Sequence, residues 1–202
     1  MSDMKPLPDH LKIKFFKFLY GEESVNTFEQ WVYETDDLEN QLTNDDYLNL
    51  ISLDFSEQNS QYEAGKILEQ YVEAGDYETW KLRRLLTTVL EQAQNLPEVL
   101  SQFYTLYCKG YDFLDGIGLG CGLSIRVPLN SLDYSADCWE DLSHEEKHQL
   151  LHSLLPQATA EAQTILSWLD ERKIVITNEQ DDLGAYIYID RRSDSDKNLA
   201  SY

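Results

Sequence analysis

The chain has 202 residues and a formal net charge of −21, with 37 Asp and Glu residues against 16 Lys and Arg. A chain of this length forms one large domain or a domain with a smaller appendage. The charge argues against nucleic acid and anionic membranes as partners, since binding to phosphate depends on clusters of Lys and Arg. It leaves open a mimic of DNA or a protein that binds a basic partner.

Most of the negative charge lies in one part of the chain. Between Glu22 and Glu78 there are sixteen carboxylate residues and one basic residue, Lys66. The 13 Tyr, 7 Phe and 4 Trp residues, with regularly spaced Leu and Ile, are too much apolar material for a disordered acidic tail. The acidic residues are therefore expected to decorate a folded body.

Apolar residues at helical spacing predict a series of helices in the first 114 residues. Three of them are expected to have side-chain caps, because these side chains can accept hydrogen bonds from the first turn. The expected caps are Ser24 or Asn26 for the second helix, Asn44 for the third and Asp76 for the fifth. Gly75 is expected to terminate the fourth helix. The expected helices cover residues 9–20, 24–35, 45–53, 60–74, 77–94 and 98–114.

The pattern changes between residues 116 and 122, where glycine alternates with apolar residues, and helix is not expected to continue there. The stretch lacks both the G-x-G-x-x-G spacing and the terminal Gly-Lys-Ser/Thr of phosphate-binding loops. Alternating glycine instead favours close backbone packing or a bent strand. A short strand over 124–128 and a loop over 129–141, anchored by Trp139, are expected to follow.

The C-terminal part begins with a capping box, Ser143 and Glu146, which predicts a helix to Leu155. A further helix is expected over 158–171. Alternating and β-branched residues at 173–177 and 185–190 predict a β-hairpin. Residues after 192 are expected to fray.

These elements predict a mainly α fold, a bundle of about six to eight helices with a small C-terminal β-hairpin. We expect an acidic helical domain over residues 1–123. Residues 124–202 are expected to pack on it, so that the whole forms one compact unit.

Several features predict a cytoplasmic protein. Residues 1–8 lack the apolar core of a signal peptide, and no apolar run reaches the roughly 20 residues of a membrane span. Cys108, Cys121 and Cys138 form an odd and widely spaced set, which fits reduced thiols better than a disulfide framework.

The segment from His144 to His148 matches the H-E-x-x-H pattern of zinc metalloproteases, and His152 extends it by one turn. A zinc site also needs a third ligand and an enclosed cleft. Here the segment opens a helix directly after Ser143, where acidic residues complement the helix N-terminus. We expect no catalytic metal and no cofactor, and retain His144 and His148 as candidate metal ligands.

The acidic residues do not match a calcium or catalytic pattern. Asp45 and Asp46 do not fall into the D-x-D-x-D-G spacing of an EF-hand loop. Paired catalytic carboxylates need surroundings that separate their pKa values, usually through burial. No catalytic residue is expected.

Three stretches carry a family resemblance: residues 18–53 (FLYGEESVNTFEQWVYETDDLENQLTNDDYLNLISL), 77–86 (YETWKLRRLL) and 110–123 (GYDFLDGIGLGCGL). They resemble acidic immunity proteins of bacterial contact-dependent and polymorphic toxin systems, over roughly the first 125 residues. The resemblance implies a cytosolic antidote, not an enzyme, that binds a cognate toxin domain, often a basic nuclease, and blocks its active site. The resemblance implies a role for this chain, but it identifies no functional residues in it.

The expected contact surface consists of acidic residues on the second to fifth helices and the tyrosines beside them. Acidic groups speed association with a basic partner, and Tyr is enriched at binding hot spots. Core packing is the alternative for each tyrosine. The expected partner-binding residues are Glu34, Asp36, Asp37, Glu39, Asp46, Tyr47, Glu63, Glu73, Asp76, Tyr77 and Glu78, and Tyr33 and Tyr62 are further candidates.

Two other classes of function remain open. A structural or scaffold protein would have no cationic partner. A pull-down with such a protein would recover no basic protein in a strongly salt-dependent way. A zinc-dependent hydrolase built on the segment 144–148 would bind stoichiometric zinc.

Overall fold

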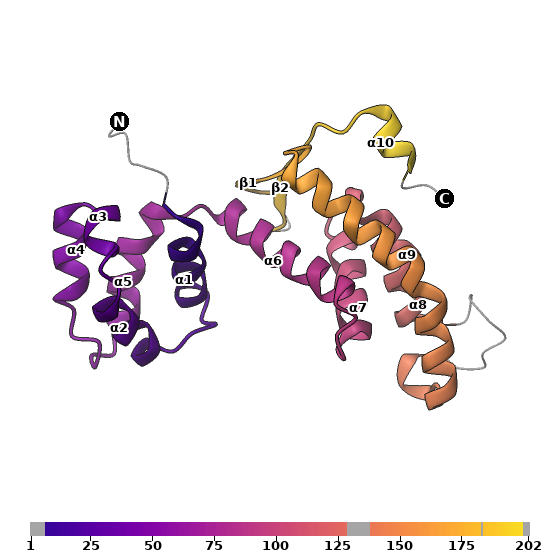
Figure 1. Ribbon diagram of the computed structural model, residues 1–202, viewed down its shortest axis with the longest axis horizontal. Coiled ribbons are helices and arrows are strands. Elements are labelled where there is room, and N and C mark those ends of the chain that lie inside the picture. The colour runs from indigo at the N-terminus through magenta and orange to yellow at the C-terminus, as the bar shows by residue number, and fades with distance from the viewer. Residues whose placement is uncertain (1–6, 129–137, 183, 200–202) are drawn as a thin grey trace. The chain divides into compact units, whose positions relative to one another are not determined.

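The chain folds mainly into helices, and the expected fold class is confirmed (Figure 1). The computed structural model describes residues 7–128, 138–182 and 184–199, and 69% of these described residues are helical. The chain divides into two compact units, Met1–Tyr77 and Glu78–Tyr202. The boundary expected after residue 123 followed a change in composition and does not coincide with this division.

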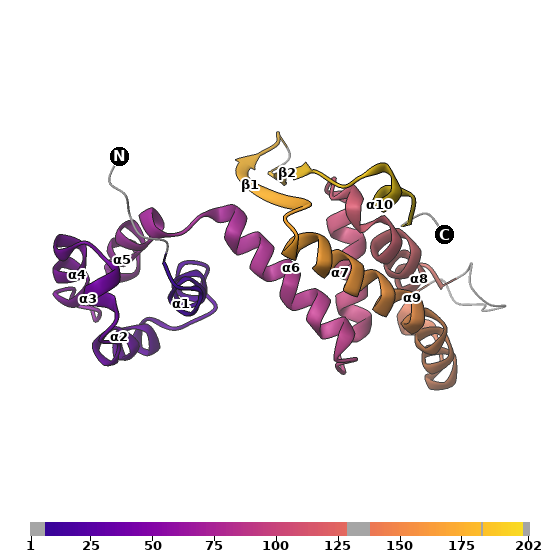
Figure 2. The ribbon, with the colours of Figure 1, turned by 45° about the horizontal axis from the view of Figure 1, so that its top comes forward.

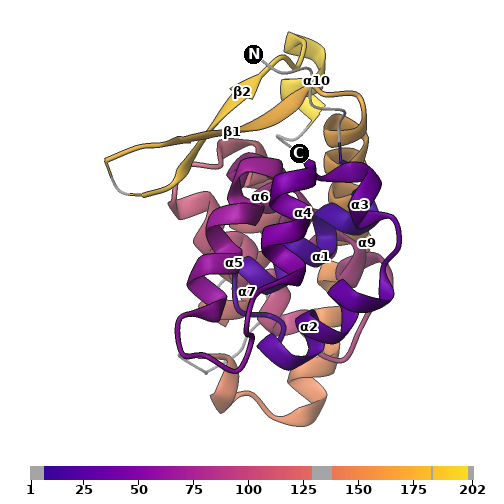
Figure 3. The same ribbon diagram turned by 90° about the vertical axis from the view of Figure 1, so that its left-hand side faces the viewer.

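Short helices build the first unit (Figure 3), and two of them begin at side-chain caps. Ser24 Oγ accepts the backbone N–H of Thr27 at 3.2 Å, and Thr43 Oγ1 accepts that of Asp46 at 3.2 Å. The prediction that Asn44 caps the third expected helix is wrong, because Asn44 is already helical and Thr43 has the extended backbone of a cap. The elements are α1 (Asp9–Leu19), α2 (Val25–Glu34), α3 (Leu38–Gln41), α4 (Asn44–Ile51) and α5 (Ser60–Leu68), followed by a 3-10 turn, Glu69–Tyr71.

Aromatic side chains form the centre of the first unit's core. Phe15 and Phe18 of α1 and Phe28 of α2 are fully buried. The rings of Phe18 and Phe28 stack with their centroids 3.9 Å apart, and Trp31 meets Phe15 edge-on at 6.1 Å. The other buried apolar residues of this core are Leu7, Leu11, Val32, Leu38, Leu42, Leu50, Phe55, Ala64 and Leu68.

The fourth expected helix ends earlier than its sequence suggests. α5 stops at Leu68, and α6 (Ala74–Leu90) begins before Gly75, which therefore does not terminate a helix. Asp76 lies in the first turn of α6 and is not its cap. The Asp76 carboxylate instead accepts a hydrogen bond from Lys12 Nζ at 2.7 Å.

Figure 2 shows the helices and the hairpin of the second unit. Among the described residues, they surround a larger core of 23 buried residues. The unit's elements from α6 onward are α7 (Leu96–Cys108), a 3-10 turn (Asp112–Leu114), a π-helix (Gly116–Gly122), α8 (Leu123–Arg126), a 3-10 turn (Trp139–Asp141), α9 (His144–Asp170), β1 (Ile174–Gln180), β2 (Tyr186–Asp190) and α10 (Asp194–Leu199). α7 ends six residues before the expected end, since Gly110 turns the chain with φ +97°. Of the loop expected over 129–141, residues 129–137 lie outside the described residues, and Trp139–Asp141 form a 3-10 turn.

The glycine-alternating stretch is helical, contrary to expectation. The π-helix Gly116–Gly122 packs against α7 and α9. A Cβ at Gly118 would lie 2.8 Å from the Phe103 carbonyl oxygen, and one at Gly122 would overlap the Leu100 carbonyl oxygen. The glycines therefore allow close contact between two helical backbones. The strand expected over 124–128 is also wrong, because α8 covers most of that range.

α9 is one continuous helix, although two helices were expected on either side of Pro156. Proline removes one helical hydrogen bond and disfavours the helix interior. The buried residues Leu150, Leu154, Ala158 and Ala162 continue along one face past this position. Tertiary packing of that face outweighs the local cost of the proline.

The expected β-hairpin is confirmed. β1 and β2 are antiparallel, with Ile174 opposite Asp190 and Ile176 opposite Tyr188. The Tyr188 ring meets Phe113 with centroids 4.9 Å apart, which attaches the hairpin to the core. Of the residues expected to fray, Asp194–Leu199 form α10 instead, because Ser193 Oγ accepts the N–H of Asp196 and the Asp196 carboxylate accepts that of Ser193; residues 200–202 lie outside the described residues.

None of the described helices has both the length and the apolar character that a bilayer crossing requires.

Replacing Gly118 by Ala should lower the free energy of unfolding by about 1–3 kcal/mol, because the new methyl group meets the backbone of α7. Gly120→Ala is the matched control. Its Cβ meets only the side chain of Gln157, with Nε2 nearest at 2.7 Å, and that side chain can move at the cost of one hydrogen bond to the Gly116 carbonyl. The control should change stability by less than about 1 kcal/mol in urea unfolding. Equal effects of the two substitutions would contradict close packing of the π-helix on α7.

Candidate functional site

The basic side chains of the first unit are largely committed to intramolecular ion pairs. Lys12 pairs with Asp76 at 2.7 Å, Lys14 pairs with Glu23, and Lys66 pairs with Glu63 at 3.3 Å. No Lys, Arg or His occurs between residues 18 and 65 of the sequence. Few basic side chains of the first unit are therefore available to neutralise the carboxylates of that stretch.

Acidic residues follow one another from α2 to α4, and all but the half-buried Glu29 are exposed. We call Glu29, Glu34, Asp36, Asp37, Glu39 and Asp45 the acidic segment. Four of them form no ion pair with any described residue: Glu29, Asp36, Glu39 and Asp45. Glu34 accepts a hydrogen bond from Gln30 Nε2 at 2.8 Å, and Asp37 lies 4.0 Å from His10 Nε2. The segment thus carries negative charge that the described fold does not neutralise.

Asp46, expected at the contact surface, has a structural role. Its carboxylate accepts hydrogen bonds from the Thr43 hydroxyl at 2.6 Å and the Tyr71 hydroxyl at 2.5 Å. Burial raises the pKa of Asp46, but these hydrogen bonds outweigh burial and leave the pKa below its usual value. Asp46 therefore links the start of α4 to the turn after α5.

The candidate tyrosines differ widely in exposure. Tyr33 is 56% and Tyr62 is 65% exposed, whereas Tyr77 is only 5% exposed. The Tyr77 ring stacks on Tyr20 with centroids 3.7 Å apart. Tyr47 packs partly against the first unit's core. Tyr33 and Tyr62 can meet a partner as they stand, and Tyr77 offers little surface.

The remaining predicted residues are not brought together with the acidic segment. Glu63 and Asp76 pair with lysines, and Glu73 is exposed just before α6. Glu78 belongs to the second unit, where its carboxylate pairs with Lys81 Nζ at 2.8 Å.

The segment 144–148 lies at the exposed start of α9. Glu146 completes the capping box by accepting the Ser143 N–H at 2.8 Å, and Glu145 accepts a hydrogen bond from Gln149 Nε2 at 2.9 Å. His144 and His148 are exposed. Within the part of the chain that the structure describes, no group of three or more His, Cys, Asp or Glu side chains could hold a metal ion. A zinc site would need a third protein ligand beside His144 and His148, and the described residues place none there.

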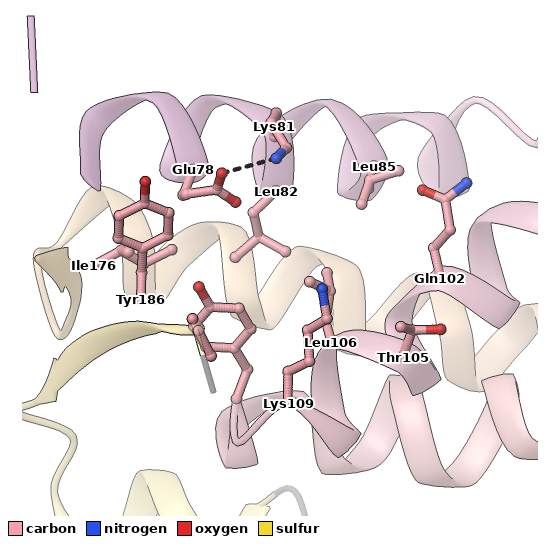
Figure 4. Close-up of a pocket in the computed structure, with 13 residues that line it drawn as sticks. Glu78, Lys81, Leu82, Leu85, Gln102, Thr105, Leu106, Lys109, Ile176 and Tyr186 are labelled. Carbon is pink, nitrogen blue, oxygen red and sulfur yellow. Dashed lines mark hydrogen bonds and ion pairs between the residues drawn. The ribbon is translucent and has the colours of Figure 1, made fainter. Parts of the chain in front are cut away.

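Sequence reasoning missed a pocket of about 320 Å³ in the second unit (Figure 4). α6 contributes Glu78, Lys81, Leu82 and Leu85, and α7 contributes Gln102, Thr105, Leu106 and Lys109. Tyr111, Ile176, Gly184, Ala185 and Tyr186 complete the lining. Each helix presents residues i, i+3, i+4 and i+7, the spacing of one helix face. The sequence feature that could have indicated the pocket is one lysine within each stripe, Lys81 and Lys109.

The pocket has one strongly perturbed group. Tyr111 is buried, and burial, with Glu78 adding to it, raises the pKa of Tyr111 to about 12. Tyr111 therefore stays protonated at neutral pH and serves as a hydrogen-bonding wall of the pocket.

A half-buried acid lies where the π-helix meets α9. The carboxyl group of Glu161 lies against Gly116, where a Cβ would overlap it. Asp115 Oδ1 accepts the Gly116 N–H at 2.8 Å, and Gln157 Nε2 donates to the Gly116 carbonyl at 3.2 Å. Burial, with the nearby charge of Asp115, raises the pKa of Glu161 above its usual value.

The neighbouring thiol is not activated. Burial raises the pKa of Cys121 to about 12, so this thiol stays protonated at neutral pH. Nucleophilic cysteines need a lowered pKa. Cys121 therefore acts as a small apolar residue of the core.

Comparisons with protein-family models, with curated proteins and with solved structures gave no match to this chain.

Glu161→Gln should raise the melting temperature at neutral pH. Because the pKa of Glu161 is raised in the folded state, its stabilising contribution is complete below the unfolded pKa and is lost as pH rises through the folded pKa. The gain over wild type should therefore vanish at acidic pH. The matched control is Glu91→Gln, which removes the same charge from an exposed position. If melting curves at several pH values show the same gain in melting temperature for both variants, the raised pKa of Glu161 is refuted.

Proposed function

We propose that this chain is a toxin-immunity protein that uses the acidic segment to bind a basic partner domain and occlude its active site. The observation that carries the proposal is a run of largely exposed carboxylates, four of which have no ion pair with any described residue, in a stretch free of Lys, Arg and His. The resemblance of residues 18–53 to acidic immunity proteins supports the same role. Cys108, Cys121 and Cys138 are free thiols, which fits action in the reducing cytoplasm.

The physical basis is electrostatic. A nuclease or other phosphate-binding enzyme needs a basic groove for its substrate. A complementary acidic surface attracts that groove over distance and raises the association rate, with an effect that weakens in salt. Once bound, the surface excludes the substrate sterically.

Exposed apolar side chains next to the acids can supply contact area. Tyr33 lies one turn after Glu29 on α2, and Leu48 lies one turn after Asp45 on α4. Leu48 is 48% exposed. The Tyr33 hydroxyl donates to the Ile51 carbonyl at 3.4 Å, so this face of α2 adjoins α4. Aromatic anchors surrounded by charged groups are typical of binding hot spots.

The proposal predicts a basic protein encoded next to this chain's own gene and bound with steep salt dependence. A segment variant, Glu29→Gln, Asp36→Asn and Glu39→Gln together, should bind it about tenfold more weakly at low salt, because three attractive charges are lost. Biolayer interferometry between about 50 and 300 mM NaCl would measure the affinity for the partner and the change of that affinity with salt concentration. Co-expression should protect cells from the partner, and the segment variant should protect less.

The matched control removes three exposed charges from the second unit, through Glu91→Gln, Glu98→Gln and Glu179→Gln. It should bind and protect as wild type does. A partner whose affinity falls equally in both variants would show only an effect of net charge. Binding that is insensitive to salt, or a neighbouring gene product that does not bind, would refute the proposal.

A further inference from the structure

The pocket of the second unit has an apolar floor bounded by two helices. Leu82 and Leu85 on α6 line it together with Leu106 on α7. Ile176 of β1 and Ala185, just before β2, line it from the hairpin. Of the lining residues, Leu82, Tyr111, Ile176 and Ala185 are buried. Figure 4 shows these side chains around a common space. Such a surface suits the apolar body of a small molecule.

The charges at the pocket favour an anion. Lys81 and Lys109 both line it, against one carboxylate, that of Glu78. Glu78 pairs with Lys81 at 2.8 Å, whereas the Lys109 ammonium has no ion pair or hydrogen bond with any described residue. The pocket therefore has one surplus positive charge in a chain of net charge −21. An unpaired ammonium beside an apolar wall is complementary to a carboxylate with an apolar tail.

The dimensions set the size of the tail. The lining stripe from Gln102 to Lys109 spans two helical turns, a rise of about 10 Å at 1.5 Å per residue, which suits an acyl chain of about eight carbons. A volume of about 320 Å³ is at the lower end for ligand sites and is small for a lipid with two chains.

We propose that this pocket binds a single-chain monocarboxylate of medium length, with its carboxylate on Lys109 and its tail along Leu106, Leu82 and Leu85. The inference is independent of the proposed function, because every lining residue belongs to Glu78–Tyr202 and the acidic segment belongs to Met1–Tyr77. Either can fail without the other.

Titration of the isotope-labelled full chain with sodium octanoate, followed by amide NMR shifts, tests the proposal. Saturable shifts should be confined to the pocket, at Leu82, Leu106 and Ala185 among others. Hexanoate, with two methylenes fewer, should bind about fifteenfold more weakly, since each buried methylene contributes about fourfold in affinity. Octylammonium, with the same tail and the opposite charge, should bind more weakly than octanoate.

Lys109→Gln should weaken octanoate binding by at least about fivefold, through loss of a charge-assisted contact. Lys17→Gln removes the same charge from the first unit and should leave the affinity unchanged. Leu85→Trp, which fills the pocket, should abolish the shifts while the circular dichroism spectrum stays that of wild type. Shifts that do not saturate or that spread over both units, equal binding of octylammonium, or unchanged affinity in Lys109→Gln would each overturn the proposal.

Discussion

The shortage of cations between residues 18 and 65 is the constraint on which the first unit depends. Self-repulsion of like charges destabilises a compact state. The ion pairs of Lys12, Lys14 and Lys66 offset part of it, but only the pair of Lys14 with Glu23 is largely buried, and exposed pairs contribute little to stability. The stacked aromatic core around Phe18 and Phe28 must therefore hold the unit together. The same arrangement leaves the acidic segment available to a basic partner.

The second unit meets a different constraint, the close approach of the π-helix to α7 and α9. Gly118 and Gly122 bring two backbones into contact, and Gly116 makes room for the Glu161 carboxyl group. Glycine is disfavoured in helices, so its repeated use here indicates that packing outweighs helix propensity. α7 is thus held on one side by the π-helix, while its other stripe, Gln102 to Lys109, lines the pocket.

Local signals in the sequence predicted most of the elements. Helical periodicity, the Ser24 and Ser143 caps and the alternation in the hairpin depend on neighbours a few residues away, and all appear in the structure. The π-helix, the continuity of α9 past Pro156 and the burial of Tyr77 depend on contacts between distant segments, which spacing alone does not report. The sequence did not predict the pocket for the same reason, because α6, α7 and the hairpin all contribute residues to its lining. The acidity of the segment was evident in the sequence, but the absence of ion pairs there required the structure.

The melting temperature as a function of ionic strength tests most directly whether the acidic segment is electrostatically uncompensated. Salt screens repulsion between exposed charges. The account predicts a melting temperature that rises between about 10 and 300 mM KCl, and a smaller rise when Glu29, Asp36 and Glu39 are neutralised together. A melting temperature that stays constant or falls with salt would show that attractive pairs dominate, and would contradict the account.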